Sequence, residues 1–253
     1  MFGGVPYGRQ GNNGVDVAAF PTAGARALLF RALIACLITT AAMPTLAQVS
    51  ASACGPIETG GYGPYDYRTD RNKLPIVEGA HFTPEVEALI RGKSTYLGAD
   101  LNYTLRRFPN HHRALIAVAR YGEKAKSPQP HDLPLPVECY FDLAVRFRPD
   151  DAIVRMLYAK FLVTNRRTPE AGRQLAAAIS IAADNPFSHY NIGLIYFDMK
   201  DYAHALAQAH VASELGFNVS PLREQLRAAG QWTDPVAAPA SAAQSGEKPA
   251  SAP

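Results

Sequence analysis

The sequence predicts an all-α protein made of antiparallel helical hairpins that stack side by side. Between about residues 97 and 232, successive apolar stretches are bounded by capping residues, Gly or Pro. Small and aromatic residues recur there at a spacing of 34, the length of a two-helix repeat. Of the whole chain, 47% is hydrophobic, which is enough to form a core for such a stack.

Four segments differ in composition. We interpret residues 1–47 as a leader and signal peptide, and residues 48–96 as an irregular N-terminal segment that contains the first helix. Residues 97–232 form the expected helical repeat domain. Residues 233–253 are dominated by Ala, Pro and Ser, and we expect this tail to be disordered because it has little apolar side chain to bury.

The segment before residue 48 indicates export. Arg26 and Arg31 precede a short apolar block, and small residues ending at Ala47 follow it. This is the order found in a cleaved signal peptide, and the block is shorter than the roughly 20 residues that cross a bilayer. We expect cleavage after Ala47 and a periplasmic or cell-envelope location. An uncleaved anchor in the inner membrane and a lipoprotein cut before Cys54 stay open as alternatives.

The cysteines fit this location. Cys36 lies in the expected signal, so the mature chain keeps Cys54 and Cys139. Two cysteines in an oxidising compartment predict one disulfide, which in the chain-entropy picture contributes about 4 kcal/mol. Two unpaired thiols are the alternative. The chain has no CxxC motif and no matching His spacing, so we expect no metal site and no cofactor.

Capping residues, Gly and Pro indicate where the helices begin and end. Residues 54–74 are rich in Gly, Tyr and Asp without a helical period, and we expect their aromatic rings to pack against the first helices. Thr83 and Pro84 suit the cap and first position of a helix that stops at Gly92. Four prolines make 127–136 a stiff loop. The helix at 97–108 is expected to end at Pro109, and the helix at 110–121 to be capped by Asn110 and to end at Gly122. Six further helices are expected at 137–147, 151–164, 168–182, 186–198, 202–215 and 220–229.

Small residues at repeating positions explain how the two helices of a hairpin pair. Ala159 is expected to face Ala171, and Gly193 to face Ala205, so that the helix backbones can approach closely. A Gly inside a helix costs about 1 kcal/mol relative to Ala. Gly193 is therefore expected where a neighbouring helix needs the space.

These positions resemble the tetratricopeptide repeat. His189 stands where that family usually has Trp, Phe217 where it often has Pro, and the preceding repeat has Arg155 at the Trp position. The resemblance implies a short solenoid of stacked hairpins over 97–232, closed by the last helix. It rests on the following residues: HYNIGLIY at 189–196, Tyr202, Ala205 and Ala212.

In tetratricopeptide proteins the first helix of each hairpin lines a concave groove that binds peptides or partner helices. The resemblance therefore implies a scaffold that binds a protein partner, and not an enzyme. The family's Lys-and-Asn clamp for a terminal carboxylate is not reproduced here, because Met156 and Lys160 occupy those positions. The matching groove positions are mostly apolar or aromatic: Ile153, Met156, Lys160, Phe187, Tyr190, Leu194 and Phe197.

The chain is also similar to a group of exported proteobacterial repeat proteins. The similar stretches are GPYDY at 63–67, HFTP at 81–84 and FPNHHRAL at 108–115. This resemblance implies a bacterial envelope location and no particular activity.

Other classes of function have less support in the sequence. Removal of residues 1–47 takes away three Arg and one Asp and brings the formal charge from +3 to +1, which gives no electrostatic indication of nucleic-acid binding. His111 and His112 suggest a second hypothesis, a cell-wall-related enzyme with its site near the Tyr-rich segment. Adjacent helical residues point about 100° apart, so the two are not expected to share a metal. A membrane-tethered assembly factor is the third hypothesis.

Overall fold

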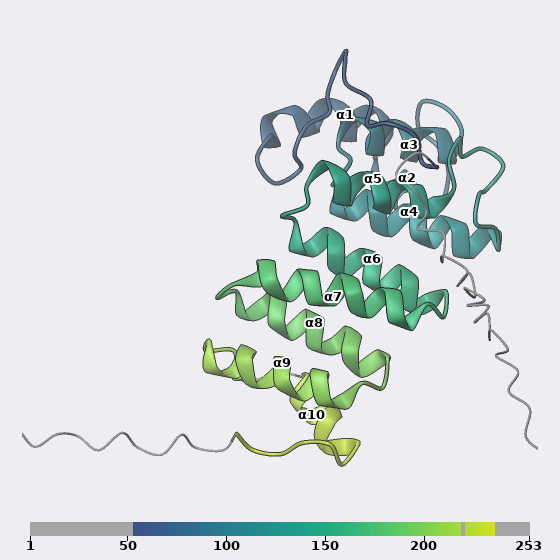
Figure 1. Cartoon of the computed structure of the whole chain (residues 1–253). Coiled ribbons are helices and arrows are strands. Elements are labelled where there is room, and N and C mark those ends of the chain that lie inside the picture. Colours follow the sequence, from purple (N-terminus) through teal and green to yellow (C-terminus); the bar gives the residue numbers. More distant parts are fainter. Residues whose placement is uncertain (1–52, 219–220, 236–253) are drawn as a thin grey trace, which may run out of the picture. The chain divides into compact units, whose positions relative to one another are not determined.

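The computed structural model describes residues 53–218 and 221–235 (Figure 1). These residues form helices and connecting segments without any β-strand, which confirms the all-α class. The predicted signal, its cleavage after Ala47 and residues 236–253 of the predicted tail lie outside the described residues. Among the residues described, no helix combines the length and apolar character needed to cross a bilayer.

The described helices follow one another with short connections. A 3-10 turn, η1 (Arg71–Lys73), precedes the first of them. In chain order the α-helices are α1 (Leu74–His81), α2 (Pro84–Glu87), α3 (Leu97–Arg107), α4 (His112–Ala125), α5 (Val137–Phe147), α6 (Ala152–Thr164), α7 (Thr168–Ala182), α8 (Pro186–Asp198), α9 (Tyr202–Glu214) and α10 (Pro221–Ala228).

Most of the expected helices are confirmed. The helices α5, α7 and α8 have the predicted bounds, α3, α6 and α9 differ by one residue at one end, and α10 is one residue shorter at each end. The loop at 127–136 contains no helix, as its prolines predict. Each of the three helices with matching bounds has a Pro at or next to its first residue, a signal that is local in sequence.

Two predictions near the N-terminus are wrong. The helix beginning at Thr83 was predicted to be the first in the chain, yet residues 74–81 form α1, which has Pro75 in its first turn and buries Leu74 and Val77. The helix expected to run from Thr83 to Arg91 is instead the single turn α2. It ends because Leu89 adopts a positive φ of 58°, a conformation that cannot continue a right-handed helix.

The predicted end of α4 at Gly122 is also wrong. The helix continues to Ala125 and ends at Lys126, which takes the left-handed conformation with φ 50°. A Cβ atom on Gly122 would lie 2.9 Å from Cγ2 of Val137 in α5. Gly122 therefore allows close packing of α5 against α4, and it does not stop the helix.

Consecutive helices pair as hairpins, with α6 beside α7 and α8 beside α9 (Figure 1). The small residues lie where the pairs are closest, because Ala159, Ala171 and Ala205 are fully buried. A Cβ atom on Gly193 would lie 3.3 Å from the Ala205 carbonyl oxygen and 2.5 Å from Cδ2 of Leu222 in α10. The expectation that a neighbouring helix needs the space at Gly193 is confirmed.

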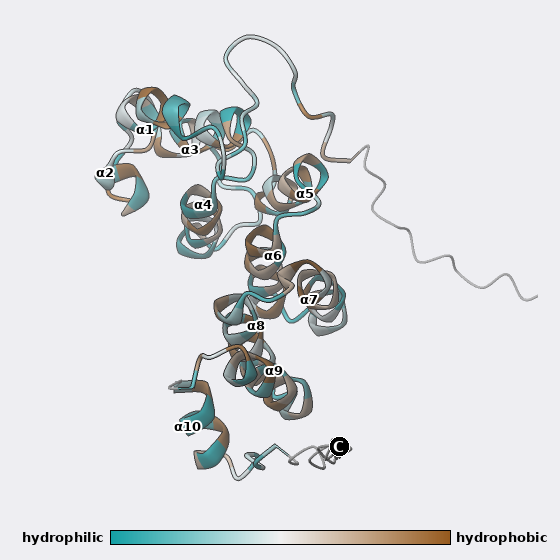
Figure 2. Cartoon of the chain, turned by 90° about the vertical axis from the view of Figure 1, so that its left-hand side faces the viewer, coloured by the Kyte–Doolittle hydropathy of each residue, from teal (hydrophilic) through white to brown (hydrophobic). Residues whose placement is uncertain are grey.

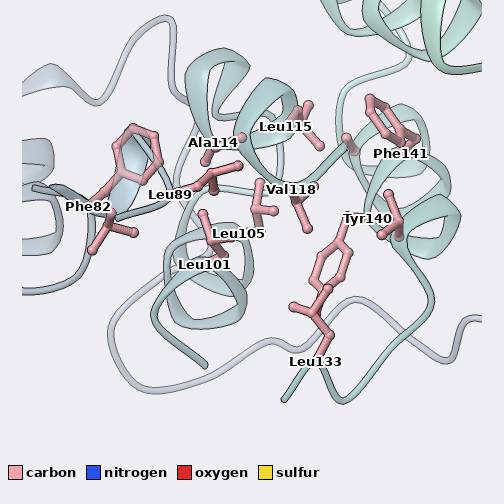
Figure 3. Close-up of a cluster of buried hydrophobic side chains, with 14 of the residues drawn as sticks. Phe82, Leu89, Leu101, Leu105, Ala114, Leu115, Val118, Leu133, Tyr140 and Phe141 are labelled. Carbon is pink, nitrogen blue, oxygen red and sulfur yellow. The ribbon is translucent and has the colours of Figure 1, made fainter. Parts of the chain in front are cut away.

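The apolar side chains gather in three buried clusters. One joins α2 to α6 and includes the residues labelled in Figure 3, among them Leu101, Leu115 and Phe141. A second joins α6 to α10. The third holds the segment before α1 against α3, and the rings of Tyr65 and Phe108 lie 5.6 Å apart there. The expected packing of the N-terminal aromatic rings is therefore confirmed. Figure 2 shows hydrophobic positions running along the whole series of helices.

Cys54 and Cys139 form a disulfide, as the sequence predicts. Their Cα atoms are 5.1 Å apart, and the bond ties the first described residues to α5. Because the sulfur of Cys54 is used in this bond, the alternative of lipid attachment at Cys54 does not fit the structure.

We predict opposite effects for two glycine substitutions within helices. Gly193→Val places new atoms against Leu222 and the Ala205 backbone, and should lower the free energy of unfolding by about 1–3 kcal/mol. Gly172→Ala adds a methyl group where no atom lies within 4 Å, and should raise it by about 0.5–1 kcal/mol. Urea denaturation followed by circular dichroism measures both changes, and a stable Gly193→Val protein would contradict the packing described here.

Candidate functional site

Capping residues set the start of the two helices that carry the predicted groove. The Asp151 side chain accepts a hydrogen bond from the Ile153 backbone N–H at 3.1 Å. The Asn185 side chain accepts one from the Phe187 backbone N–H at 3.0 Å. Ile153 and Phe187 therefore occupy the same position, the second residue, of α6 and of α8.

The predicted groove residues of α6 and α8 form a surface that carries exposed apolar side chains. We call it the α6–α8 face, and it consists of Ile153, Lys160, Phe187, Tyr190, Leu194 and Phe197. Ile153 is 43% exposed and Phe187 is 59% exposed. Lys160 is also exposed, and the other predicted groove residues of α8 are half-buried: Tyr190, Leu194 and Phe197. A role of these side chains in binding a partner stays a prediction.

Met156 is an exception among the predicted groove residues. It is only 7% exposed and belongs to the same buried cluster as Leu162 and Ile192. An unbranched methionine can bend into gaps between packed helices, and here it fills the core between α6 and α8. The sequence-based placement of Met156 on the groove surface is therefore corrected.

Phe217 covers part of the α6–α8 face. This residue lies in the connection between α9 and α10, and its ring centroid is 5.0 Å from that of Phe187 and 4.9 Å from that of Tyr190. The ring of Phe197 packs against Tyr202 at 5.3 Å. The chain thus partly shields the aromatic residues of α8, whereas Ile153 and Lys160 on α6 stay open.

A second constellation, which we call the Asn110 cluster, surrounds the start of α4. The side-chain amide of Asn110 donates to Asp66 at 2.7 Å and to Asp151 at 3.0 Å. Its oxygen accepts a hydrogen bond from the Tyr67 backbone N–H at 2.9 Å. Asn110, Asp66 and Asp151 are all buried. One amide therefore joins the segment before α1, the start of α4 and the start of α6.

Arginines complete the Asn110 cluster. Arg68 and Arg148 bind the Asp66 carboxylate at 2.8 and 2.6 Å. Burial raises the pKa of Asp66, but the hydrogen bonds from Arg68, Asn110 and Arg148 outweigh it and hold the pKa well below its usual range. Burial likewise opposes ionisation of Asp151, and its hydrogen bond with His112 lowers the pKa overall. Both carboxylates are therefore charged at neutral pH.

His111 has a structural place in the helix. Its Nδ1 accepts the Ala114 backbone N–H at 3.2 Å, and its Nε2 donates to Glu78 at 3.1 Å. His111, and not Asn110 as the sequence suggested, is thus the N-cap of α4. Burial lowers the pKa of His111 despite the partner carboxylate. Both ring nitrogens are engaged inside the protein.

The side chain of His112 faces a different carboxylate from that of His111. Its Nε2 lies 2.9 Å from Oδ2 of Asp151, whereas His111 reaches Glu78. The two histidines therefore face different carboxylates and do not converge on one point. Within the described residues, no group of three or more His, Cys, Asp or Glu side chains is arranged to hold a metal ion.

Sequence reasoning found the helix starts but missed the Asn110 cluster. The contacts from Asn110 to Asp66 and Asp151 span 44 and 41 residues, so no local spacing could reveal them. The available signal was that Asp66 and Asn110 each stand within two residues of a buried aromatic residue, Tyr67 and Phe108.

Comparison with family models, with curated proteins and with solved structures finds no match to this chain. The function must therefore be argued from the geometry of the described residues.

We predict that Asn110→Ala destabilises the fold strongly. The substitution removes three buried hydrogen bonds and takes one donor from each of two buried carboxylates, so the free energy of unfolding should fall by about 2–4 kcal/mol. Asn191→Ala is the matched control, since Asn191 is exposed and bonds only within α8, and it should change stability by less than about 0.5 kcal/mol. Equal urea midpoints for the two variants would contradict this account.

We also predict a pH dependence that originates at His111. Its folded-state pKa lies below 6.5, so below about pH 6.5 the unfolded chain takes up a proton that the folded protein resists. Stability should therefore fall as the pH goes from 7 toward 5, whereas the lowered carboxylate pKa values act only below about pH 4.5.

His111→Asn keeps an oxygen that can cap α4 but removes the titration. Its free energy of unfolding, measured by urea denaturation at each pH, should vary less between pH 7 and 5 than that of the original protein. His131→Asn, at an exposed loop histidine, is the control. An unchanged slope in His111→Asn would show that the pH dependence arises from another group.

Proposed function

We propose that the protein is an exported scaffold that binds a peptide or helix of a protein partner with its α6–α8 face. The observation that carries this proposal is the exposure of Ile153 and Phe187, at 43% and 59%, on equivalent positions of two neighbouring helices. Large apolar side chains grouped on a surface mark binding sites more often than single exposed ones do.

The helix order supports a short solenoid of the tetratricopeptide type. The pairs α6–α7 and α8–α9 have the same hairpin form, and α8 contacts both helices of the preceding pair. In such a stack the first helices of successive hairpins share one side, which brings α4, α6 and α8 together as a binding surface. The last helix, α10, buries Leu222 and Leu226 against this stack and so acts as its closing helix.

The composition of the α6–α8 face suits a peptide ligand. Aromatic rings supply apolar area at a small loss of conformational entropy, and Lys160 at the edge can pair with an acidic group of the partner. The histidines favour binding over catalysis, because His111 uses both ring nitrogens to hold α4 and Glu78 in place.

The disulfide supports export. Disulfides persist in oxidising compartments such as the periplasm, and Cys54–Cys139 is formed in the structure. We therefore propose a periplasmic or envelope location, with cleavage of the leader as the expectation that the next experiment tests.

Mass spectrometry of the protein purified from its natural host tests the cleavage. We predict an N-terminus at Gln48 and a mass two hydrogen atoms below that of the reduced mature chain. A chain that retains residues 32–47 and sediments with membranes would support the tethered alternative instead.

Photo-crosslinking in living cells tests the binding face. A benzophenone amino acid at Phe187 should give a discrete adduct whose partner can be identified by mass spectrometry. The same group at Arg173 of α7, whose side chain is 70% exposed, is the control and should give none. A folded, abundant protein without an adduct at Phe187 would count against the proposed face.

A substitution on the neighbouring helix sharpens this test. With the crosslinker at Phe187, Ile153→Asp should lower the adduct yield about fivefold, the change expected for a loss of about 1 kcal/mol in binding. Ile76→Asp makes the same substitution at a 64% exposed position on α1 and should leave the yield unchanged. Equal yields in both variants would place the contact outside the α6–α8 face.

A further inference from the structure

A separate cavity lies beneath the first described residues. Cys54 to Glu58, which we call the N-terminal strap, crosses a cavity of about 240 Å³ between α3 and α5. The strap is held by the Cys54–Cys139 disulfide and by a hydrogen bond from Arg146 to the Gly55 carbonyl oxygen at 2.8 Å. Neither the α6–α8 face nor the Asn110 cluster contributes a residue to this cavity.

The wall of the cavity is largely apolar. Tyr140 donates its hydroxyl hydrogen to Asn102 at 2.9 Å, so these two polar groups satisfy each other. Apart from one charged pair at its edge, most of the remaining wall is aliphatic, which favours an aliphatic ligand over a sugar or a nucleotide. Six of its residues supply this surface: Pro56, Ile57, Leu105, Pro134, Leu135 and Leu143.

One charged pair borders the cavity. Arg106 of α3 forms an ion pair with Glu58 of the strap, and both side chains line the cavity while remaining 42% and 53% exposed. The guanidinium of arginine matches the geometry of a carboxylate. The pairing of Glu58 with Arg106 therefore indicates that this end of the cavity accepts a carboxylate.

We propose that this cavity binds a small aliphatic carboxylate. The chain of the ligand lies among the leucines and prolines, and its carboxylate replaces that of Glu58 on Arg106. Dry apolar cavities of about 150 Å³ accept benzene, so the volume here accommodates roughly ten carbon atoms. The head group stays at the solvent-exposed end, where its charge remains hydrated and paired.

Isothermal titration calorimetry with octanoate tests this proposal on the disulfide-intact chain. Octanoate should bind with a stoichiometry of one, and octanol, which has the same chain without the charge, should bind at least tenfold more weakly. Arg106→Gln should weaken octanoate binding about tenfold and leave octanol unaffected. Arg120→Gln, at an exposed arginine of α4 outside the cavity, is the control and should change neither.

Glu58→Gln distinguishes this site from general adsorption to the surface. Without the competing carboxylate, octanoate should bind several-fold more tightly, which no non-specific mode explains. Leu143→Trp should fill the cavity and abolish the binding of both compounds, with circular dichroism confirming the fold. Absence of octanoate binding at millimolar concentration, equal binding of octanol, or unchanged affinity in Arg106→Gln and Glu58→Gln would each overturn the proposal.

Discussion

The side-chain amide of Asn110 is the interaction on which the arrangement of the described chain depends. It connects the carboxylates of Asp66 and Asp151, which lie on two segments that share no helix. Asp151 in turn caps α6 through the backbone N–H groups of Ile153 and Val154. Because buried charges are tolerated only when fully bonded, any displacement of α6 relative to α4 would leave one of these carboxylates without its partners. The position of Ile153 on the proposed binding face is thus set from the start of α4.

A second constraint acts further along the chain and is steric. The contact between α8 and α9 needs a residue without a side chain at Gly193, because Leu222 of α10 and the backbone of Ala205 already fill the space around its Cα. The same close approach turns Ile192 and Tyr196 inward and leaves the opposite side of α8 to Phe187 and Leu194. Core packing therefore decides which side chains remain for binding.

The fold could be predicted from the sequence where its determinants are local. Helices α5, α7 and α8 have periodic apolar residues and a Pro at or next to their first residue, and their bounds were predicted correctly. The bounds of α2 and α4 depend on distant packing: Leu89 turns into the core with a positive φ, and Gly122 makes room for Val137. The candidate site follows the same rule. The resemblance to the tetratricopeptide repeat predicted Ile153, Met156 and Phe187 as groove residues, but it could not show that Met156 bends inward, because rotamer choice depends on the neighbouring helix.

The interruption of the repeat offers a physical reason for the cavity. In the later hairpins a tight turn joins the two helices, and small residues bring them into extensive contact. Between α4 and α5 the loop 127–136 replaces that turn, and the two helices touch much less. Two loop residues, Pro134 and Leu135, line the cavity together with the strap. The space between α3 and α5 is therefore completed by two segments that form no helix, and the disulfide from Cys54 to Cys139 holds one of them, the strap, in place.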